Sequence, residues 1–291
     1  MTTLVNVDGK LGSESDPLLS PLDQGFLFGA SVYETVRTYG GRVFLLGRHL
    51  ERLRESAKAL DITLDVSDEE LAARVRETIV AAGNPESSIR IVVSAGVGAI
   101  DYRAGSAPKP TVVVIVRPLP EYPESLYREG ARAVFVKMMR ATRGGLDPRI
   151  KSSNLLTNLS ALREAQRKKA YEAIMLNPDG EVAEGSMSNV FLVSKGVVRT
   201  PPISAGILEG ITRELVIEVA REAGYRVEER GFKPDDLLRA DEVFITASAR
   251  QIVPIVQVDK ARIGNGKPGP VTRTLITAYK DRVRALINEK E

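Results

Sequence analysis

The sequence predicts an α+β protein built from two domains. The chain has 291 residues, which is enough for two compact domains. Segments with strand periodicity and segments with helix periodicity both recur along its whole length. The segment RPLPEYPESLY carries Pro118, Pro120 and Pro123 and is the best candidate for a linker. We therefore expect a small α/β domain at residues 1–117, a linker at 118–130 and a large domain at 131–291.

The composition is that of an ordinary globular protein, with 43% apolar and 27% charged residues. The 41 basic and 38 acidic side chains give a net charge of +3, and the two signs alternate along most predicted helices. A nucleic-acid partner is therefore not expected, because it requires clustered basic residues. The N-terminal sequence MTTLVNVDGK has no signal-peptide pattern, and no apolar run approaches about 18 residues. We expect a cytoplasmic protein with no membrane partner.

In the first domain, two hairpins and two helices are predicted. VNVDGKL reads as a hairpin around Asp8-Gly9, and SVYETVRTYGGRVFLL as two strands joined at Gly40-Gly41. A helix is expected in HLERLRESAKAL, and a second helix follows the capping box that Ser67 opens. RIVVSAGV and TVVVIVRPL are β-branched and read as buried strands. The residues expected to face inward from the two helices are Leu50, Leu53, Ala57 and Leu60, then Leu71, Val75 and Ile79.

The second domain is predicted to continue this mixture of strands and helices. ARAVFVKMM is a strand, YEAIMLN and EVAEG flank a turn at residues 177–180, and NVFLVSKGVVRTPP is a hairpin turning at Lys195-Gly196. DEVFITASARQIVPIV reads as a pair of strands around a corner of small residues. Helices are expected in GILEGITRELVIEVAREAGY and in VTRTLITAYKDRVRALINEK. Their expected buried residues are Leu215, Val219 and Ala223, then Leu275, Tyr279, Val283 and Leu286.

Several kinds of chemistry are excluded by residue usage. Cysteine is absent, so disulfides, thiol nucleophiles and cysteine–zinc sites are impossible. The single histidine, His49, is expected to be a helix-start residue, and no metal site is expected. Gly96-Val97-Gly98 lacks the third glycine of a dinucleotide fingerprint. An enzyme of this sequence must move protons with Lys, Tyr, Asp or Glu, with or without a cofactor.

One lysine stands in an unusual place. In RIKSSNLLTNLSALREAQ, residues 149–166, Leu155, Leu159 and Leu162 repeat at helical spacing, and Ser152 and Ser153 are candidate caps. Lys151 then precedes the positive end of the helix, where a cation is disfavoured. A solvent-facing lysine beside a loop is the ordinary alternative.

Two further stretches suit an anion. In LEGITRE, residues 208–214, the backbone N–H groups of Gly210, Ile211 and Thr212 would point out together at a helix start. TASA, residues 246–249, ends a buried strand with small residues. Glu184, which follows another strand, is either exposed or holds a proton on the ring nitrogen of a cofactor. Arg52 lies off the apolar stripe of its helix, so a solvated arginine is its default interpretation.

Four ordered motifs carry a resemblance that covers essentially the whole chain. They are IKSSNLLTNLSALREA, DGEVAEGSMSNVF, GILEGITRE and ADEVFITASARQIVPI. In order and spacing they resemble the fold type IV pyridoxal-phosphate enzymes, the class IV aminotransferases. The resemblance implies the two-domain fold of the D-amino-acid aminotransferase type, pyridoxal 5'-phosphate as cofactor, a large domain that binds this cofactor, and a homodimer or higher homo-oligomer.

The resemblance also implies a role for each matching residue. Lys151 looks like the catalytic Schiff-base lysine, and Glu184 like the partner of the pyridine nitrogen. An imine forms through a neutral amine, so the positive helix end and a desolvated pocket would lower the pKa of Lys151 from about 10.4 to roughly 7–8. The residues expected around the cofactor phosphate are Arg52, Ile211, Thr212, Ala247 and Ser248. Those expected on the substrate side are Tyr33 and Ala249, and the candidate ligands for the substrate carboxylate are Arg37, Arg90, Tyr102, Arg103 and Arg143.

The substrate is the open part of the reading. The Arg-x-His typical of the D-amino-acid branch is absent from VVSAGVGAIDYR, and the tyrosine of the L-branched-chain branch two residues before Arg90 is replaced by Ser88. The first choice is an aminotransferase acting on branched-chain L-amino acids and a 2-oxo acid such as 2-oxoglutarate, because smooth apolar strand residues suit such side chains. The alternatives are a D-amino-acid or (R)-amine transaminase, an aminodeoxychorismate lyase, and a cofactor-free binding protein.

Overall fold

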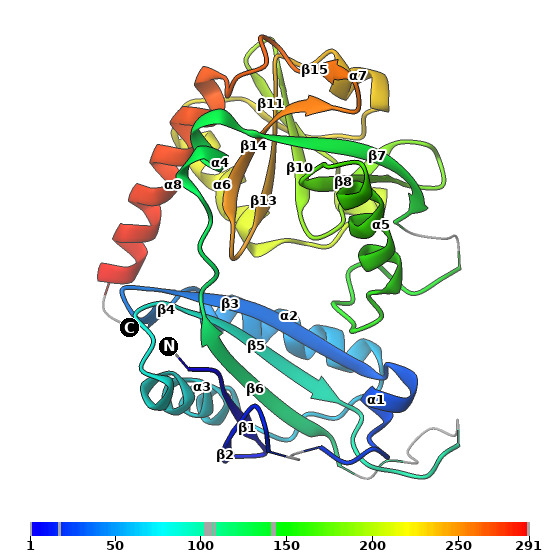
Figure 1. The fold of residues 1–291 in the computed structure, drawn as a ribbon, viewed down its shortest axis with the longest axis vertical. Helices are drawn as coiled ribbons and strands as arrows, with labels where there is room; N and C mark the ends of the chain where they lie inside the picture. The colour runs from blue at the N-terminus through cyan, green and yellow to red at the C-terminus, as the bar shows by residue number, and fades with distance from the viewer. Residues whose placement is uncertain (1, 17–18, 102–106, 108, 141–143, 290–291) are drawn as a thin grey trace. The chain divides into compact units, whose positions relative to one another are not determined.

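The computed structural model describes residues 2–16, 19–101, 107, 109–140 and 144–289. The chain divides into two compact units (Figure 1). Unit 1 comprises Met1–Pro120 together with Ile150–Asn154, and unit 2 comprises Glu121–Arg149 together with Leu155–Glu291. The chain therefore returns to unit 1 for five residues, Ile150–Asn154, in the middle of unit 2.

Unit 1 is built on one antiparallel sheet. Within the described residues it has six strands in the order β2-β1-β6-β5-β3-β4. The strands are β1 (Leu4–Val7), β2 (Lys10–Ser13), β3 (Ser31–Tyr39), β4 (Arg42–Val43), β5 (Ser87–Ser94) and β6 (Thr111–Pro118). The predicted hairpins are confirmed: Asp8 and Gly9, then Gly40 and Gly41, all have positive φ, as two-residue turns of the type I′ kind require.

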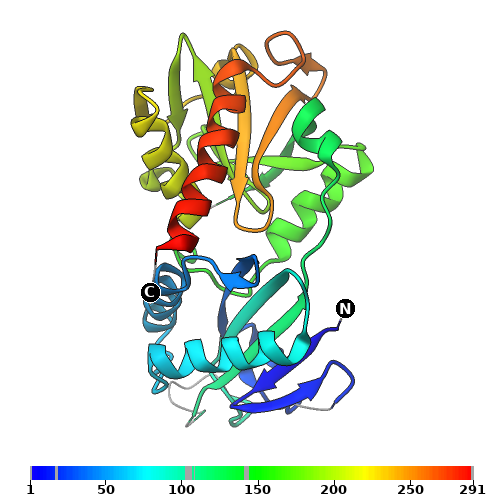
Figure 2. The ribbon, with the colours of Figure 1, turned by 90° about the vertical axis from the view of Figure 1, so that its left-hand side faces the viewer.

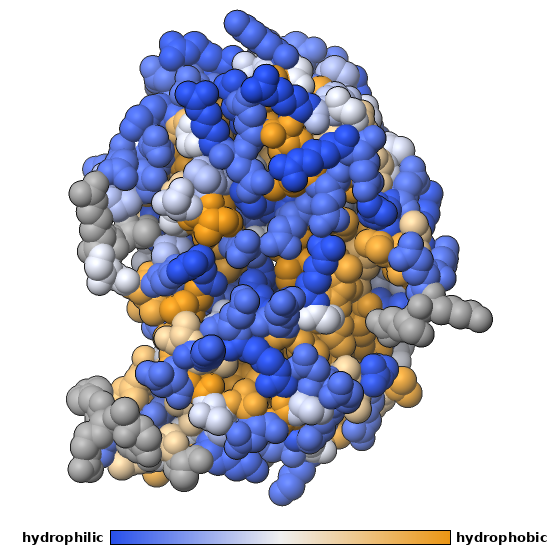
Figure 3. Space-filling model, turned by 180° about the vertical axis from the view of Figure 1, so that it is seen from behind, coloured by the Kyte–Doolittle hydropathy of each residue, from blue (hydrophilic) through white to orange (hydrophobic). Residues whose placement is uncertain are grey.

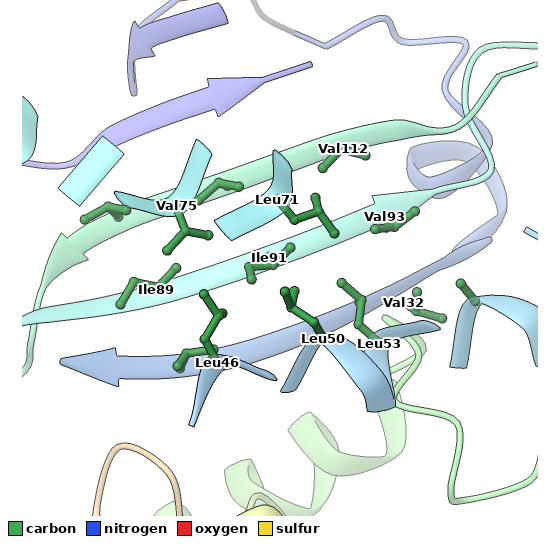
Figure 4. Close-up of a cluster of buried hydrophobic side chains, with 14 of the residues drawn as sticks. Val32, Leu46, Leu50, Leu53, Leu71, Val75, Ile89, Ile91, Val93 and Val112 are labelled. Carbon is green, nitrogen blue, oxygen red and sulfur yellow. The ribbon is translucent and has the colours of Figure 1, made fainter. Parts of the chain in front are cut away.

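Helices cover one face of this sheet. They are α2 (Leu46–Ala59) and α3 (Asp68–Ala82), and the short α1 (Gln24–Phe28) precedes β3. The two helices and the sheet share one core (Figure 4). It contains Leu50 and Leu53 of α2, Leu71 and Val75 of α3, and Ile91 of β5. Alternate strand residues thus supply the core, while the residues between them lie on the opposite face.

Unit 2 is built on a larger mixed sheet. Within the described part of the chain it has nine strands, in the order β12-β11-β10-β13-β14-β7-β8-β9, with β15 paired to β14. The pairs β7–β8, β14–β7 and β11–β12 are parallel, and the remaining pairs are antiparallel. The strands are β7 (Ala131–Met139), β8 (Glu172–Leu176), β9 (Val182–Gly185), β10 (Asn189–Ser194), β11 (Val197–Thr200), β12 (Val227–Glu229), β13 (Glu242–Ala247), β14 (Gln251–Val258) and β15 (Ala261–Arg262).

The helices of unit 2 pack on this sheet. They are α4 (Glu124–Glu129), α5 (Leu156–Arg167), the 3-10 turn η1 (Ile203–Ala205), α6 (Ile211–Glu222), α7 (Pro234–Leu238) and α8 (Pro270–Asn288). Figure 2 shows the long α8 beside α6 and along the sheet, and both helices contact β13. The predicted inward residues of α8 are confirmed for Leu275, Tyr279 and Val283, whereas Leu286 is half-buried.

Three details differ from the sequence prediction. The segment 118–130 is not all linker, because residues 124–129 form α4, whose Leu126 belongs to the core of unit 2. In α6, Leu215 and Val219 are buried as expected, but Ala223 is the exposed C-cap residue. In α5, the buried residues are Asn158, Ala161 and Ala165 instead of the leucine row.

The start of α5 also differs from the prediction. The helix begins at Leu156, and its N-cap position is Leu155. Ser152 and Ser153 do not cap it, because their backbone is paired with β3: Ser152 forms a bridge with Val32, and Ser153 N–H donates to Ser31 O at 2.9 Å. Lys151 therefore does not sit at the positive end of a helix.

The surface carries both polar and apolar residues. Figure 3 shows a mostly hydrophilic face with scattered hydrophobic areas. Large apolar side chains that are more than two-thirds exposed include Phe26, Val80, Ile100 and Leu156. Among the described residues, none of the helices is both long and apolar enough to span a bilayer.

Candidate active site

The sequence-predicted site residues fall into two groups, one in each unit. Unit 1 carries Tyr33, Arg37, Arg52, Arg90 and Lys151. Unit 2 carries Glu184, Ile211, Thr212, Ala247, Ser248 and Ala249. Tyr102, Arg103 and Arg143 lie outside the described residues.

Lys151 is held by backbone bonds on both sides. Its carbonyl oxygen accepts from Tyr33 N–H at 2.9 Å, and its own N–H donates to Ser56 Oγ of α2 at 3.1 Å. The neighbouring bridge between Ser152 and Val32 continues this pairing along the edge of β3. A short β-like segment, and not a helix end, thus fixes the backbone from which the lysine side chain projects.

The Tyr33 ring contacts both a lysine amine and an arginine guanidinium. Lys151 Nζ lies 4.8 Å from the centroid of the Tyr33 ring, and the Arg90 guanidinium carbon lies 3.8 Å from the same centroid. Tyr33 itself is only 6% exposed. Burial lowers the pKa of Arg90, although an arginine remains charged at neutral pH. The predicted lysine, tyrosine and arginine are therefore brought together on one unit.

Arg37 lies farther along the same face of the sheet. Register pairs Thr35 with Arg90 and Arg37 with Ser88, so both arginines lie on the face opposite the helices. Arg37 stacks on Tyr39 at 4.0 Å, and its Nε donates to Thr38 O at 3.2 Å. Arg90 therefore stacks on Tyr33, the ring that Lys151 also contacts, whereas Arg37 stacks on a different ring, that of Tyr39.

Arg52 is not the solvated residue that its default interpretation assumed. Its side chain is 11% exposed, and it makes a two-pronged bond to Glu34: Nε donates to Oε1 at 2.7 Å, and Nη2 donates to Oε2 at 2.8 Å. His49 Nδ1 lies 2.7 Å from the same Oε2. His49 is in the first turn of α2, as expected, but it is buried and engaged.

Glu184 is a buried carboxylate at the end of β9. It is 4% exposed, and its Oε2 accepts from Leu208 N–H at 3.0 Å and from Asn189 Nδ2 at 3.3 Å. Its Oε1 accepts from Arg140 Nε. The exposed-carboxylate alternative for Glu184 is therefore wrong.

The N-terminus of α6 has the form expected of an anion site. Gly210 is its N-cap, and in the described part of the chain no side chain caps this end. A β-carbon on Gly210 would lie 2.0 Å from Asn189 Oδ1, so any larger residue would force Asn189 to move. The first N–H groups of the helix, at Ile211 and Thr212, have no partner within the helix and attract negative charge.

The loop after β13 contains Ser248 and Ala249, and a buried ion pair stands beside it. Arg250 Nη2 donates to Glu172 Oε2 at 3.3 Å and to Met187 O at 3.1 Å. Glu172 is fully buried and also accepts from Ser188 Oγ at 2.9 Å. One carboxylate thus ties the loop after Glu184 to the loop that contains Ser248.

These residues fit pyridoxal phosphate. A phosphate requires N–H donors and a close backbone approach, which the glycine-capped α6 offers. A pyridine nitrogen that stays protonated requires a buried anion, which Glu184 offers. In the described residues, no cluster of histidine, aspartate and glutamate could hold a metal ion.

Several residues that shape the site were not anticipated. Glu34, Ser56, Arg140 and Asn189 hold predicted residues in place, and Glu172 binds Arg250, the residue after Ala249. Glu34 had a detectable signal, because in VYETV it occupies a core position of a strand, where a carboxylate requires a cation. Arg140 had none, because its partner Glu184 is 44 residues away in the sequence.

Comparison with known proteins identifies similar chains over nearly the full length. The family described as amino-transferase class IV matches residues 31–258. A Methanocaldococcus jannaschii protein provisionally named branched-chain-amino-acid aminotransferase is 38% identical over 95% of both chains. Aminodeoxychorismate lyase of Bacillus subtilis is 35% identical over 99% of this chain and 97% of that one. D-alanine aminotransferase of Bacillus licheniformis is 34% identical over 95% of both chains.

Solved structures agree with the fold. The Escherichia coli branched-chain amino acid aminotransferase superposes with a TM-score of 0.93 at 28% identity, covering 100% of this chain and 97% of that chain. The T.th. branched-chain amino acid aminotransferase, solved with pyridoxamine 5'-phosphate, gives a TM-score of 0.91 at 30% identity, covering 99% and 96%. The α+β fold expected from the sequence is thereby confirmed as the fold type IV arrangement.

Proposed function

Because the chain belongs to the class IV aminotransferases, pyridoxal-phosphate-dependent transaminases, we propose that it moves amino groups between branched-chain L-amino acids and a 2-oxo acid such as 2-oxoglutarate. The observation that carries this proposal is the shared contact of Lys151 and Arg90 with the Tyr33 ring. It puts a reactive amine close to a cation that suits a carboxylate.

The apolar surroundings favour branched-chain substrates. Val92 pairs with Tyr33, and Val113 and Ile115 of β6 pair with Val92 and Arg90, all on the face opposite the helices. Such side chains bury methyl groups favourably, at about 0.8 kcal/mol for each CH₂. The valine and isoleucine side chains offer no hydrogen bond to a polar donor side chain, whereas Arg37 and Arg117 lie farther along the same face.

Each unit would contribute separate functions. Pyridoxal phosphate, when bound, supplies a sink for the electrons released at the substrate α-carbon. In unit 1, Lys151 Nζ would hold the cofactor covalently and carry a proton from and back to the substrate α-carbon. In unit 2, Glu184 would hold the proton on the pyridine nitrogen. The phosphate would be held by Ile211, Thr212, Ala247 and Ser248 of unit 2 and by Arg52 of unit 1. Arg90 would bind the substrate carboxylate, with Arg37, Tyr33 and Ala249 on the substrate side.

A donor panel tests the substrate. L-leucine, D-alanine and (R)-1-phenylethylamine are each offered with 2-oxoglutarate and with pyruvate. We expect transfer from L-leucine to 2-oxoglutarate to be fastest. Faster transfer from D-alanine or the (R)-amine would contradict the branched-chain proposal and leave the transaminase class intact.

A second candidate is a lyase that releases pyruvate from aminodeoxychorismate. The B. subtilis lyase is as similar to this chain as the D-alanine aminotransferases are, and Ser88 is smaller than the tyrosine expected in the branched-chain enzymes. Pyruvate release without a 2-oxo acid acceptor, together with no transfer from any of the three donors, would establish this alternative.

The role of Lys151 is tested chemically. Borohydride treatment of the holoenzyme should leave the cofactor attached to the peptide that contains Lys151, as found by mass spectrometry. Lys151→Ala should lower the transamination rate at least about 10²–10⁴-fold, the range that a positioned proton carrier contributes. Attachment to a different lysine would refute this assignment, and full activity in Lys151→Ala would support a cofactor-free function.

The proposal includes a homodimer or higher homo-oligomer located in the cytoplasm. The family resemblance supports the oligomer. Light scattering after size exclusion should give at least twice 31.7 kDa.

A further inference from the structure

A buried cluster in unit 1 has no direct part in the proposed reaction. Glu34 follows Tyr33 on β3, so its side chain points to the opposite face, toward α2. Glu34 is fully buried and His49 is 3% exposed. Glu34 Oε1 accepts from Arg52 Nε, while Oε2 accepts from Arg52 Nη2 and lies 2.7 Å from His49 Nδ1.

The protonation states in this cluster follow from its charges. Burial alone would raise the pKa of Glu34, but the charge of Arg52 and the hydrogen bonds from His49 and Arg52 outweigh it and lower this pKa to about 2. Glu34 is therefore ionised and can only accept hydrogen bonds. Burial lowers the pKa of His49, so its ring is neutral near pH 7 and must carry its hydrogen on Nδ1.

We propose that Glu34, fixed by His49, is a positioning residue that orients Arg52 for the phosphate of the cofactor. The inference rests on the proposed phosphate-binding role of Arg52. A two-pronged bond sets both the direction and the plane of a guanidinium. The arginine side chain is then already ordered before the ligand binds, so binding does not have to cost the entropy of ordering it. The edge bonded to Glu34 is Nε–Nη2, which directs the opposite end of the guanidinium away from the carboxylate.

The same helix connects this cluster to the reactive lysine. Ser56 lies one turn after Arg52 on α2, and its Oγ accepts from the backbone N–H of Lys151. The position of Arg52 and the position of the Lys151 backbone therefore both depend on one stretch of α2. A shift of α2 relative to β3 would move both residues.

A purely structural role for the ion pair is the competing explanation. A buried pair is often close to neutral for stability, so its presence alone does not establish what it does. The two explanations differ in their effect on phosphate. By charge alone, removing Glu34 would relieve repulsion and tighten phosphate binding, whereas loss of orientation would weaken it.

Glu34→Gln is the informative substitution because no orientation of its amide satisfies the cluster. An NH₂ group in place of Oε2 would face two donors, Arg52 Nη2 and His49 Nδ1, and in place of Oε1 it would face Arg52 Nε. The guanidinium must then turn. We expect the dissociation constant of pyridoxal phosphate to rise about 10- to 100-fold, the usual effect of losing a charge-assisted hydrogen bond.

Pyridoxal, which lacks the phosphate, separates positioning from structure. Its affinity should change less than about twofold in Glu34→Gln, whereas a general disturbance would weaken both compounds equally and overturn the proposal. Tighter binding of pyridoxal phosphate would also overturn it. The matched control is Asp68→Asn, which removes the negative charge that pairs at 2.6 Å with Arg54 Nε on the same helix and should alter neither affinity.

Two further variants keep the test decisive if Glu34→Gln folds poorly. His49→Asn retains a donor where Nδ1–H lies and should bind pyridoxal phosphate nearly as wild type, while His49→Leu should bind it more weakly. In an Arg52→Gln background, His49→Leu should have no further effect, and an additive loss would overturn the proposal. If Arg52→Gln alone leaves pyridoxal phosphate affinity unchanged, the assigned role of Arg52 falls with it. A donor panel without transfer would instead count against the proposed reaction and substrate, and it would leave the result for Glu34 standing, because cofactor affinity is measured without turnover.

Discussion

At the scale of single residues, the site depends on charges that are partly withdrawn from water. The guanidinium of Arg90 stacks on Tyr33 on the face of the sheet opposite the helices, and burial lowers its pKa without neutralising it. A partly desolvated cation attracts a carboxylate more strongly than an exposed one, because the effective dielectric constant around it is lower.

Arg90→Gln should therefore impair substrate binding. We expect kcat/KM for the 2-oxo acid to fall about 10- to 100-fold, mainly through KM, since a charge-assisted hydrogen bond is lost. The control is Arg117→Gln: Arg117 is exposed on the same face, in register with Ser88, and its loss should change kcat/KM less than about twofold. Equal effects of the two substitutions would show that only the general positive charge matters.

His49 offers a direct measurement, because it is the only histidine in the chain. Its ring should give a single titrating signal in proton NMR. Burial lowers its pKa below the ordinary 6.5, although the bond to Glu34 opposes this effect. We expect a midpoint below 6.5 in the wild type and a lower one in Glu34→Gln, where the carboxylate charge is gone. A midpoint above 6.5 would contradict the buried, neutral ring.

At the scale of elements, helix α6 joins the two chemical tasks of unit 2. Asn189 Nδ2 donates to Glu184 Oε2 and to Leu208 O, while its Oδ1 lies where a β-carbon on Gly210 would be placed. The side-chain amide of Asn189 thus contacts both the N-terminus of α6 and the buried carboxylate of Glu184. This arrangement explains why glycine, although a weak helix former, stands at the N-cap.

Gly210→Ala should disturb both tasks together. The added methyl would displace Asn189, so we expect weaker pyridoxal phosphate binding and a loss of about 1–3 kcal/mol in the free energy of unfolding. Gly47→Ala is the matched control, because a β-carbon there meets no atom within 4 Å among the described residues and lies in helix α2. It should be neutral or stabilising, by up to about 1 kcal/mol. Urea titrations and cofactor titrations of both variants would measure these effects.

The elements also show where local sequence reasoning succeeds and fails. The hairpins at Asp8-Gly9, Gly40-Gly41 and Lys195-Gly196 were predictable, because their turns require positive φ. The start of α5 was not, because Ser152 and Ser153 look like caps but their backbone pairs with β3, more than a hundred residues earlier. Capping signals are local, and a distant strand edge can override them.

At the scale of the whole molecule, the sequence pointed to candidate reactive residues but not to the residues that support them. Lys151 and Glu184 stand in contiguous motifs, so the sequence alone could nominate them for the roles that we propose. The division into units could not be read fully, because Ile150–Asn154 leaves unit 2 and joins unit 1. Supports such as Glu172, whose partner Arg250 is 78 residues away, require the folded structure.

Acid should destabilise the folded chain through the buried cluster of unit 1. The pKa of Glu34 is lowered to about 2 in the folded state from an ordinary value of 4.5, so between these values the unfolded chain binds more protons. The stability that Glu34 contributes is present above about pH 4.5 and is lost as the pH falls toward 2. At about 1.36 kcal/mol per pKa unit, it amounts to roughly 3 kcal/mol. The lowered pKa of His49 acts in the same direction and begins below pH 6.5.

The measurement is the free energy of unfolding in urea at several pH values between 7 and 3, for the wild type, Glu34→Gln and His49→Asn. Other carboxylates titrate in the same range, so the informative quantity is the difference between wild type and variant at each pH. That difference should shrink for His49→Asn below about pH 6.5, and for Glu34→Gln below about pH 4.5, because the wild type loses there what each variant never had. A difference that stays constant with pH, or that grows in acid, would mean that neither group has a lowered pKa in the folded chain. The charge states assigned to the cluster, which are ionised for Glu34, neutral for His49 and cationic for Arg52, would then have to be revised together.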